Sequence, residues 1–250
     1  MKTPLLALAL GAAMLVPVAA HADDTDPNVL DSTHWLQRHR IDLEWGQVGP
    51  VVKKGKLDFT GQIRMHPAGF KADTYDQLVS PVYGFANGWE ATAGVSMAQR
   101  LGPGGTAFFF GGGLQKEILR GEGWRPSVSL GGYGMFGPHD YQGGSVYLAA
   151  TEKLYSDRKG FGVYLHGGAK YELFSSDDYG DHSGVRPYTG VSVSYKRKYS
   201  LEGEYSPRQS FEQQDPWSLR ASVKVYKNFE LSGGIRSSGY RTHPFIGFGF

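Results

Sequence analysis

WSLRASVKVYKNFELSGGIRSSGYRTHPFIGFGF, residues 217–250, alternates apolar and polar side chains along three consecutive segments. In the first segment, Trp217, Leu219 and Ala221 are separated by Ser218 and Arg220. Alternation with a period of two residues is typical of a β-strand whose two faces meet different surroundings. The stretch therefore predicts antiparallel β-structure with one apolar and one charged face.

The same alternation recurs upstream and makes a helical domain an untenable interpretation. It predicts an all-β antiparallel barrel of about twelve strands, with ten or fourteen as alternatives if a hairpin is split or missed. The whole region 56–250 forms one domain in this interpretation. The expected strands are 56–65, 78–86, 89–99, 106–118, 124–136, 144–155, 161–173, 186–196, 199–206, 217–226, 229–237 and 243–250.

The connections between these segments carry an independent signal. Asn87-Gly88, Arg197-Lys198 and Lys227-Asn228 are tight hairpin turns, whereas residues 66–77, 174–185 and 207–216 are long and polar. Short turns at one end and long loops at the other are typical of bacterial outer-membrane barrels, in which the short turns are periplasmic. The pattern places both chain ends in the periplasm and requires an even number of strands.

The front of the chain predicts export. Residues 1–22 combine a cationic start at Lys2, an apolar stretch from Leu5 to Val18 and the small-residue site Ala20-His21-Ala22, which together indicate a secretory signal peptide. Residues 23–55 fit less well, and we expect a periplasmic extension or a plug inside the barrel. A thirteenth strand at Ile41, Leu43 and Trp45 conflicts with the even number.

Composition excludes several classes of function. The chain has no cysteine, so disulfides and thiolate chemistry are excluded. Its cations are dispersed rather than clustered, which argues against nucleic-acid binding. Beyond the signal peptide no run of 18 apolar residues exists, so helical membrane spans are excluded.

A secreted β-sandwich would also use strands with one apolar face, and the chain end separates the two alternatives. Ile246, Phe248 and Phe250 share one face of the last strand. This arrangement resembles the C-terminal insertion signature of bacterial outer-membrane proteins, which the barrel-assembly machinery recognises. Aromatic residues near many strand ends would form interfacial girdles against outer-membrane lipid and lipopolysaccharide.

Charged residues on the polar faces would line the lumen. Arg64, Lys170, Arg186 and Arg236, with Glu172 among them, fall toward the outer end. Asp58, Glu90, Glu202 and Glu230 fall toward the periplasmic end with Lys196 and Lys224, and Arg220 and Glu204 share the same inner face. These charges would either orient a charged or sugar-like solute in a pore or form cross-strand ion pairs that fill the lumen.

His166 is the histidine expected to face the lumen from the middle of a strand. Ser192, Ser194 and Glu202 on neighbouring segments could approach it as in a hydrolase. An outer-membrane lipase, however, needs its nucleophile on the lipid-facing side, so we expect a hydrogen-bonded lumen histidine and no enzyme activity. The acidic residues Asp177, Asp178 and Asp181 with His182 match no calcium-loop spacing, so neither a metal nor a cofactor is expected.

The closing hairpins also carry a family resemblance. Pro187, Glu204-Tyr205, the segment Val225 to Phe229 and the segment Pro244 to Gly247 resemble the last strands of YjbH-like outer-membrane barrels. That resemblance implies a role in exopolysaccharide production or export and brings no catalytic residues. The expected function is a non-enzymatic, porin-like barrel for polysaccharide export or passage of small solutes. A lipid- or lipopolysaccharide-modifying enzyme and a closed structural barrel are the alternatives.

Overall fold

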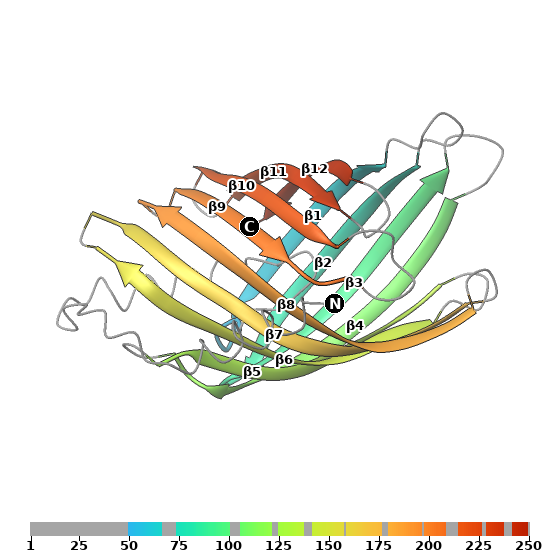
Figure 1. Ribbon diagram of the computed structural model, residues 1–250, viewed down its shortest axis with the longest axis horizontal. Coiled ribbons are helices and arrows are strands. Elements are labelled where there is room, and N and C mark those ends of the chain that lie inside the picture. Colours follow the sequence, from blue (N-terminus) through green and yellow to red (C-terminus); the bar gives the residue numbers. More distant parts are fainter. Residues whose placement is uncertain are drawn as a thin grey trace, which may run out of the picture.

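The computed structural model is a β-barrel (Figure 1) and describes residues 50–66, 74–100, 106–121, 125–137, 142–157, 159–176, 180–196, 198–208, 215–226, 229–237 and 242–249. The strands of this described part are β1 (Leu57–His66), β2 (Thr74–Ala86), β3 (Trp89–Arg100), β4 (Thr106–Leu119), β5 (Ser127–Phe136), β6 (Gln142–Ser156), β7 (Phe161–Ser176), β8 (Gly180–Tyr195), β9 (Tyr199–Tyr205), β10 (Trp217–Tyr226), β11 (Phe229–Ser237) and β12 (Thr242–Gly249). None of the described residues forms a helix long and apolar enough to cross a membrane.

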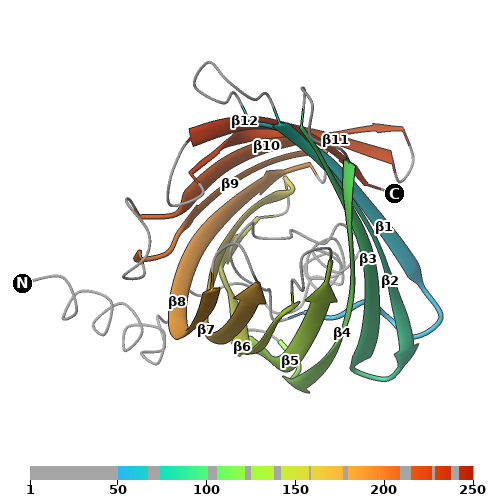
Figure 2. The same ribbon diagram turned by 90° about the vertical axis from the view of Figure 1, so that its right-hand side faces the viewer.

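The twelve strands close into one ring (Figure 2), each antiparallel to its neighbour in the chain. Closure joins β1 to β12, with Thr60 opposite Gly249 and Arg64 opposite Phe245. A closed ring satisfies the backbone hydrogen bonds that would otherwise be exposed at a sheet edge. The prediction of an all-β antiparallel barrel with twelve strands is confirmed. The expected signal peptide, residues 1–22, lies outside the described residues, as do residues 23–49.

Side chains alternate between the two faces of the wall, and the arrangement is the reverse of that in a soluble protein. On β10, Leu219 is 44% exposed on the outside, whereas its neighbour Ser218 is 7% exposed on the inside. Soluble proteins bury the apolar side of such strands, and a sandwich core would consist of those positions. The sandwich alternative is therefore excluded by the observed arrangement.

Two ends of the barrel are distinguished by their connections. The short-turn rim carries Asn87-Gly88 between β2 and β3 and residues 196–198 between β8 and β9, and β1 begins and β12 ends at this same rim. Gly88 (φ +70°) and Lys196 (φ +51°) lie in the left-handed region, as tight turns require. The opposite end, which we term the long-loop rim, carries the connection 206–216.

Two of the predicted loops are shorter in the structure than the sequence predicted. Residues 174–185 are mostly strand, because β7 runs to Ser176 and β8 starts at Gly180, with Ser175 opposite Asp181. Similarly, β2 starts at Thr74, which reduces the predicted loop 66–77 to residues 67–73. The short-turn rim also carries the longer connection 120–126, so the difference between the two rims is weaker than the sequence predicted.

Candidate functional site

The candidate site is the inner wall of the barrel, by which we mean the side chains that face its interior. Backbone parity fixes this set, because every second residue of a strand faces inward. The buried charged residues of the described inner wall are Glu90, Lys170, Arg186, Glu202, Glu204, Glu230 and Arg236. Charged groups are rarely buried unless they are paired, so their contacts define what the interior can do.

A basic cluster lies toward the long-loop rim. Lys170 on β7 faces Arg186 directly across the strand pair. Glu172 holds the two cations together, with its carboxylate 2.8 Å from Lys170 Nζ and 2.6 Å from Arg186 Nε. One carboxylate between two cations leaves a net positive charge on this part of the wall. A patch of net positive charge attracts anionic groups.

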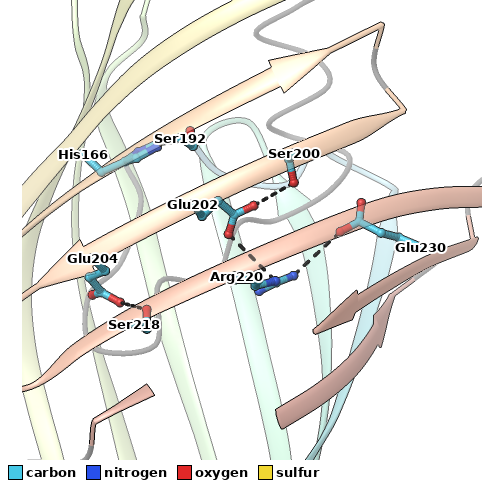
Figure 3. Close-up of polar contacts among 8 residues, drawn as sticks. All are labelled: His166, Ser192, Ser200, Glu202, Glu204, Ser218, Arg220 and Glu230. Carbon is cyan, nitrogen blue, oxygen red and sulfur yellow. Dashed lines mark hydrogen bonds and ion pairs between the residues drawn. The ribbon is translucent and has the colours of Figure 1, made fainter. Parts of the chain in front are cut away.

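A second cluster of charged residues, which we term the glutamate–arginine cluster, spans β9, β10 and β11 (Figure 3) and centres on Arg220. The Arg220 guanidinium lies 3.9 Å from the Glu202 carboxylate and 3.8 Å from that of Glu230. Register explains the first contact, because Arg220 and Glu202 are direct cross-strand partners. Ser200 donates a 3.0 Å hydrogen bond to Glu202, and Ser218 donates a longer one of 3.5 Å to Glu204.

Two further cations belong to this part of the wall, because Lys224 lies directly opposite Glu230, and Arg236 lies opposite Ser218, the cross-strand partner of Glu204. With Arg220 they balance the charge of the three glutamates. Of the two clusters, the basic one therefore carries the net charge. Cross-strand ion pairs exist in both clusters. Internal ion pairing is one of the two interpretations that the sequence left open, and the lining of a pore by these charges stays a prediction.

His166 joins three strands at the inner wall. Its Nε2 lies 2.7 Å from Ser192 Oγ on β8, and its Nδ1 lies 3.0 Å from Thr151 Oγ1 on β6. Figure 3 shows His166 pointing toward Ser192, while Glu202 lies on the strand beyond. In serine hydrolases a carboxylate occupies the position that Thr151 takes here, and the nucleophile is open to substrate. Both His166 and Ser192 are fully buried, so this geometry is that of a structural hydrogen-bond chain.

Aromatic rings cover glycines on the inner wall, a feature that the sequence interpretation missed. Tyr147 lies directly opposite Gly131, and Tyr188 lies opposite Gly168. A Cβ added at either glycine would collide with the tyrosine hydroxyl end, so each ring lies flat against the wall. Tyr147 also donates a 2.9 Å hydrogen bond to Gln115. The sequence did contain a signal for this feature: in each pair, the tyrosine and the glycine both occupy inward-facing positions, on neighbouring strands.

The remaining predicted residues occupy varied places. Asp58 is half-buried on β1. Arg64 pairs through its backbone with Asp76 and Phe245, and its side chain lies outside the described residues. Asp181 belongs to β8 rather than to a loop. Among the described residues, no group of three or more His, Cys, Asp or Glu gathers as metal ligands.

The last strand presents its apolar face to the outside. Ile246 is exposed there, and Phe248 stacks on Phe59 of β1 with 6.5 Å between ring centroids. Phe250 lies outside the described residues. The insertion signal predicted from Ile246, Phe248 and Phe250 therefore stays a prediction.

Comparison with solved structures identifies the fold type. The KdgM porin in complex with disordered oligogalacturonate superposes with a TM-score of 0.58 at 13% identity, over 77% of this chain and 98% of that one. The KdgM porin gives 0.53 at 15% identity, over 78% and 97% of the two chains. The NanC porin in a rhombohedral crystal form gives 0.52 at 9% identity, over 78% and 98%.

These similarities show that the chain has the barrel fold of outer-membrane porins. No protein-family model and no curated protein matches the sequence. The resemblance to YjbH-like barrels therefore stays a prediction.

Proposed function

We propose that this chain is a non-enzymatic, porin-like barrel of the bacterial outer membrane that passes small charged or sugar-like solutes. The observation that carries the proposal is the distribution of side chains across the wall. On β6, Val146 and Leu148 are exposed on the outside, while Ser145 and Tyr147 are buried inside. Such a surface is stable in lipid, and a polar interior is what a solute path needs.

Lysine and aromatic residues at the short-turn rim support the membrane location. Lys116 lies 5.1 Å over the Trp89 ring, and Lys198 lies 5.4 Å over that of Tyr199. Lys196 makes the same contact with Tyr195 at 5.1 Å. Aromatic rings next to lysine ammonium groups are typical of the interface between lipid acyl chains and headgroups. With an exported chain, this rim would face the periplasm.

The solute class follows from the wall chemistry. Lys170 and Arg186 offer cationic hydrogen-bond donors toward the long-loop rim, and serines line much of the inner wall. One similar porin was solved with oligogalacturonate, a carboxylated sugar chain, and the basic cluster offers suitable partners for carboxylates. Export of an exopolysaccharide, which the YjbH-like resemblance implies, would use the same chemistry. We therefore propose anionic oligosaccharides as the preferred solutes.

Planar-bilayer recording with the purified mature protein tests this function. We expect single-channel current that oligogalacturonate blocks at lower concentration than a neutral oligosaccharide of equal length. Changing Lys170 and Arg186 together to glutamine should raise the half-blocking concentration of oligogalacturonate about tenfold, because a hydrogen bond to a charged group contributes about 1.5 kcal/mol. The exposed rim variant Arg125→Gln serves as the control and should block like the native chain.

Other results would contradict the proposal. A closed structural barrel would give no current. Equal block by charged and neutral sugars would remove the preference for anions. Hydrolysis of outer-membrane lipid that is lost in His166→Ala would instead support the enzyme alternative.

A further inference from the structure

A tight reversal precedes β1 and docks on the neighbouring strand β2. Lys56 donates a backbone hydrogen bond of 3.0 Å to Lys53, and Gly55 between them has φ +76°. Gly55 N–H donates to the carbonyl of Gly84 at 2.6 Å, and Gly84 N–H donates to that of Lys56 at 3.0 Å. The reversal is therefore fixed to β2 at the short-turn rim.

Val51 and Val52, just before this reversal, lie against the inner wall. Val51 is 4% exposed and Val52 2%, although most buried residues of the described barrel are polar. Val52 N–H donates a 2.7 Å hydrogen bond to a carboxylate oxygen of Glu90, which itself faces inward from β3. Buried backbone groups need such partners. Val82, on the inner face of β2, is also fully buried, which adds apolar surface to this part of the interior.

Gly84 is the position that permits the close approach. A Cβ at Gly84 would overlap the carbonyl oxygens of Val52 and Lys53, so no larger residue fits while the segment is in place. Gly84 and Glu90 are direct cross-strand partners. Together they form a dock in which one residue leaves room for the incoming backbone and the other accepts its N–H group.

We infer that residues 50–56 are an insert held inside the barrel by Gly84 and Glu90, and that this insert narrows the solute path at the short-turn rim. The occupant of the dock is thus a segment of the chain itself. An extended segment takes about 5 Å of width, which is a large share of the interior of a small barrel. The effect on passage rests on the proposed porin function, whereas the docking of residues 50–56 does not.

Single-channel recording of the full mature chain with Gly84→Ala tests the narrowing. The added methyl group must displace the backbone of Val52 and Lys53, so the conductance should rise roughly twofold as the path widens. Gly203→Ala on β9 is the matched control, because nothing lies within 4 Å of a Cβ at that glycine. Its conductance should equal that of the native chain. Equal conductance in both variants would overturn the inference.

Cysteine labelling tests the docking independently of channel conductance. It also leaves Gly84 unchanged. The chain contains no cysteine, so Val52→Cys introduces a single reporter. In reconstituted vesicles it should react slowly with a charged thiol reagent and about tenfold faster once Glu90→Gln weakens the hydrogen bond. Lys54→Cys, at an exposed position, should react quickly in both backgrounds.

The two measurements separate the insert from the porin function. If Val52→Cys reacts as fast as Lys54→Cys in the native background, residues 50–56 are not docked and the inference is wrong. If Val52→Cys is protected but no variant conducts, the porin function and the narrowing are wrong, and the docked segment remains.

Discussion

Replacing Leu148 by arginine should destabilise the folded barrel in a bilayer by about 2–4 kcal/mol. Leu148 lies near the middle of β6 and is 50% exposed on the outer wall. In the proposed location this surface touches acyl chains, where a guanidinium loses its hydration. In a water-soluble protein, an exposed substitution of this kind usually changes stability by no more than about 0.5 kcal/mol.

The same substitution at the rim provides the control for depth. Leu57 begins β1 at the short-turn rim and is 62% exposed. Leu57→Arg should cost only about 0–1 kcal/mol, because the charge reaches the interface. Reversible denaturant unfolding in lipid vesicles measures both free energies. Equally small losses for the two variants would show that the outer wall does not contact lipid.

The second large effect is expected for Arg220→Gln, which removes the cation that Glu202 and Glu230 share in the glutamate–arginine cluster. Glu202 and Glu230 would then lose their shared partner in a buried setting. Removing one member of a buried ion pair typically costs on the order of 3 kcal/mol, since the remaining charge has lost its compensation. We expect a loss of this size in vesicle unfolding, together with a shift of channel selectivity toward cations.

A double-mutant cycle checks that the loss arises from the ion pairs. Adding Glu230→Gln to Arg220→Gln removes one of the two carboxylates that lost their contact with Arg220 and should recover part of the stability. Arg125→Gln, at an exposed rim position, should change stability by less than about 1 kcal/mol. Strict additivity of the Arg220 and Glu230 substitutions would mean that the two side chains do not interact.

Strand positions could be predicted from the sequence because the pleat enforces a period of two residues. The alternation of Leu219 with Ser218 and Arg220 needed no tertiary information, and it assigned these residues to the correct faces of β10. In the proposed membrane location, a wall between lipid and a polar interior keeps this contrast along the membrane-spanning part of a strand. The predicted β10 and β11 consequently have the observed ends.

The pattern fails where a strand continues beyond the apolar belt. Residues 174–185 were assigned to a loop because they are polar, yet β7 and β8 pair as far as Ser176 and Gly180. The arrangement has a physical reason in the proposed membrane location. Beyond the lipid, both faces of a strand meet water and no alternation is required, while the backbone hydrogen bonds can still continue.

The partners within the site depend on register, which parity leaves undetermined. Parity placed Lys170, Glu172 and Arg186 on inward faces, but only the pairing of Lys170 with Arg186 shows that Glu172 bridges them. A plug inside the barrel was one of the two expectations for residues 23–55, but the sequence did not single out Val52, because an isolated apolar pair before a strand has no periodicity. Its place depends on the space left by Gly84 and on the carboxylate of Glu90.

Spin-label scanning of β10 in lipid vesicles tests most directly whether the apolar wall faces lipid and the charged wall faces a separate interior. Single cysteines at each position from 218 to 223 carry the label, since the chain has no native cysteine. We predict that oxygen dissolved in the bilayer reaches labels at Leu219, Ala221 and Val223, and that labels at the alternate positions are shielded from it. If all six labels were equally accessible to a water-soluble relaxation agent, with no period of two residues, the outer wall of β10 would not face lipid and the proposed membrane location would be wrong.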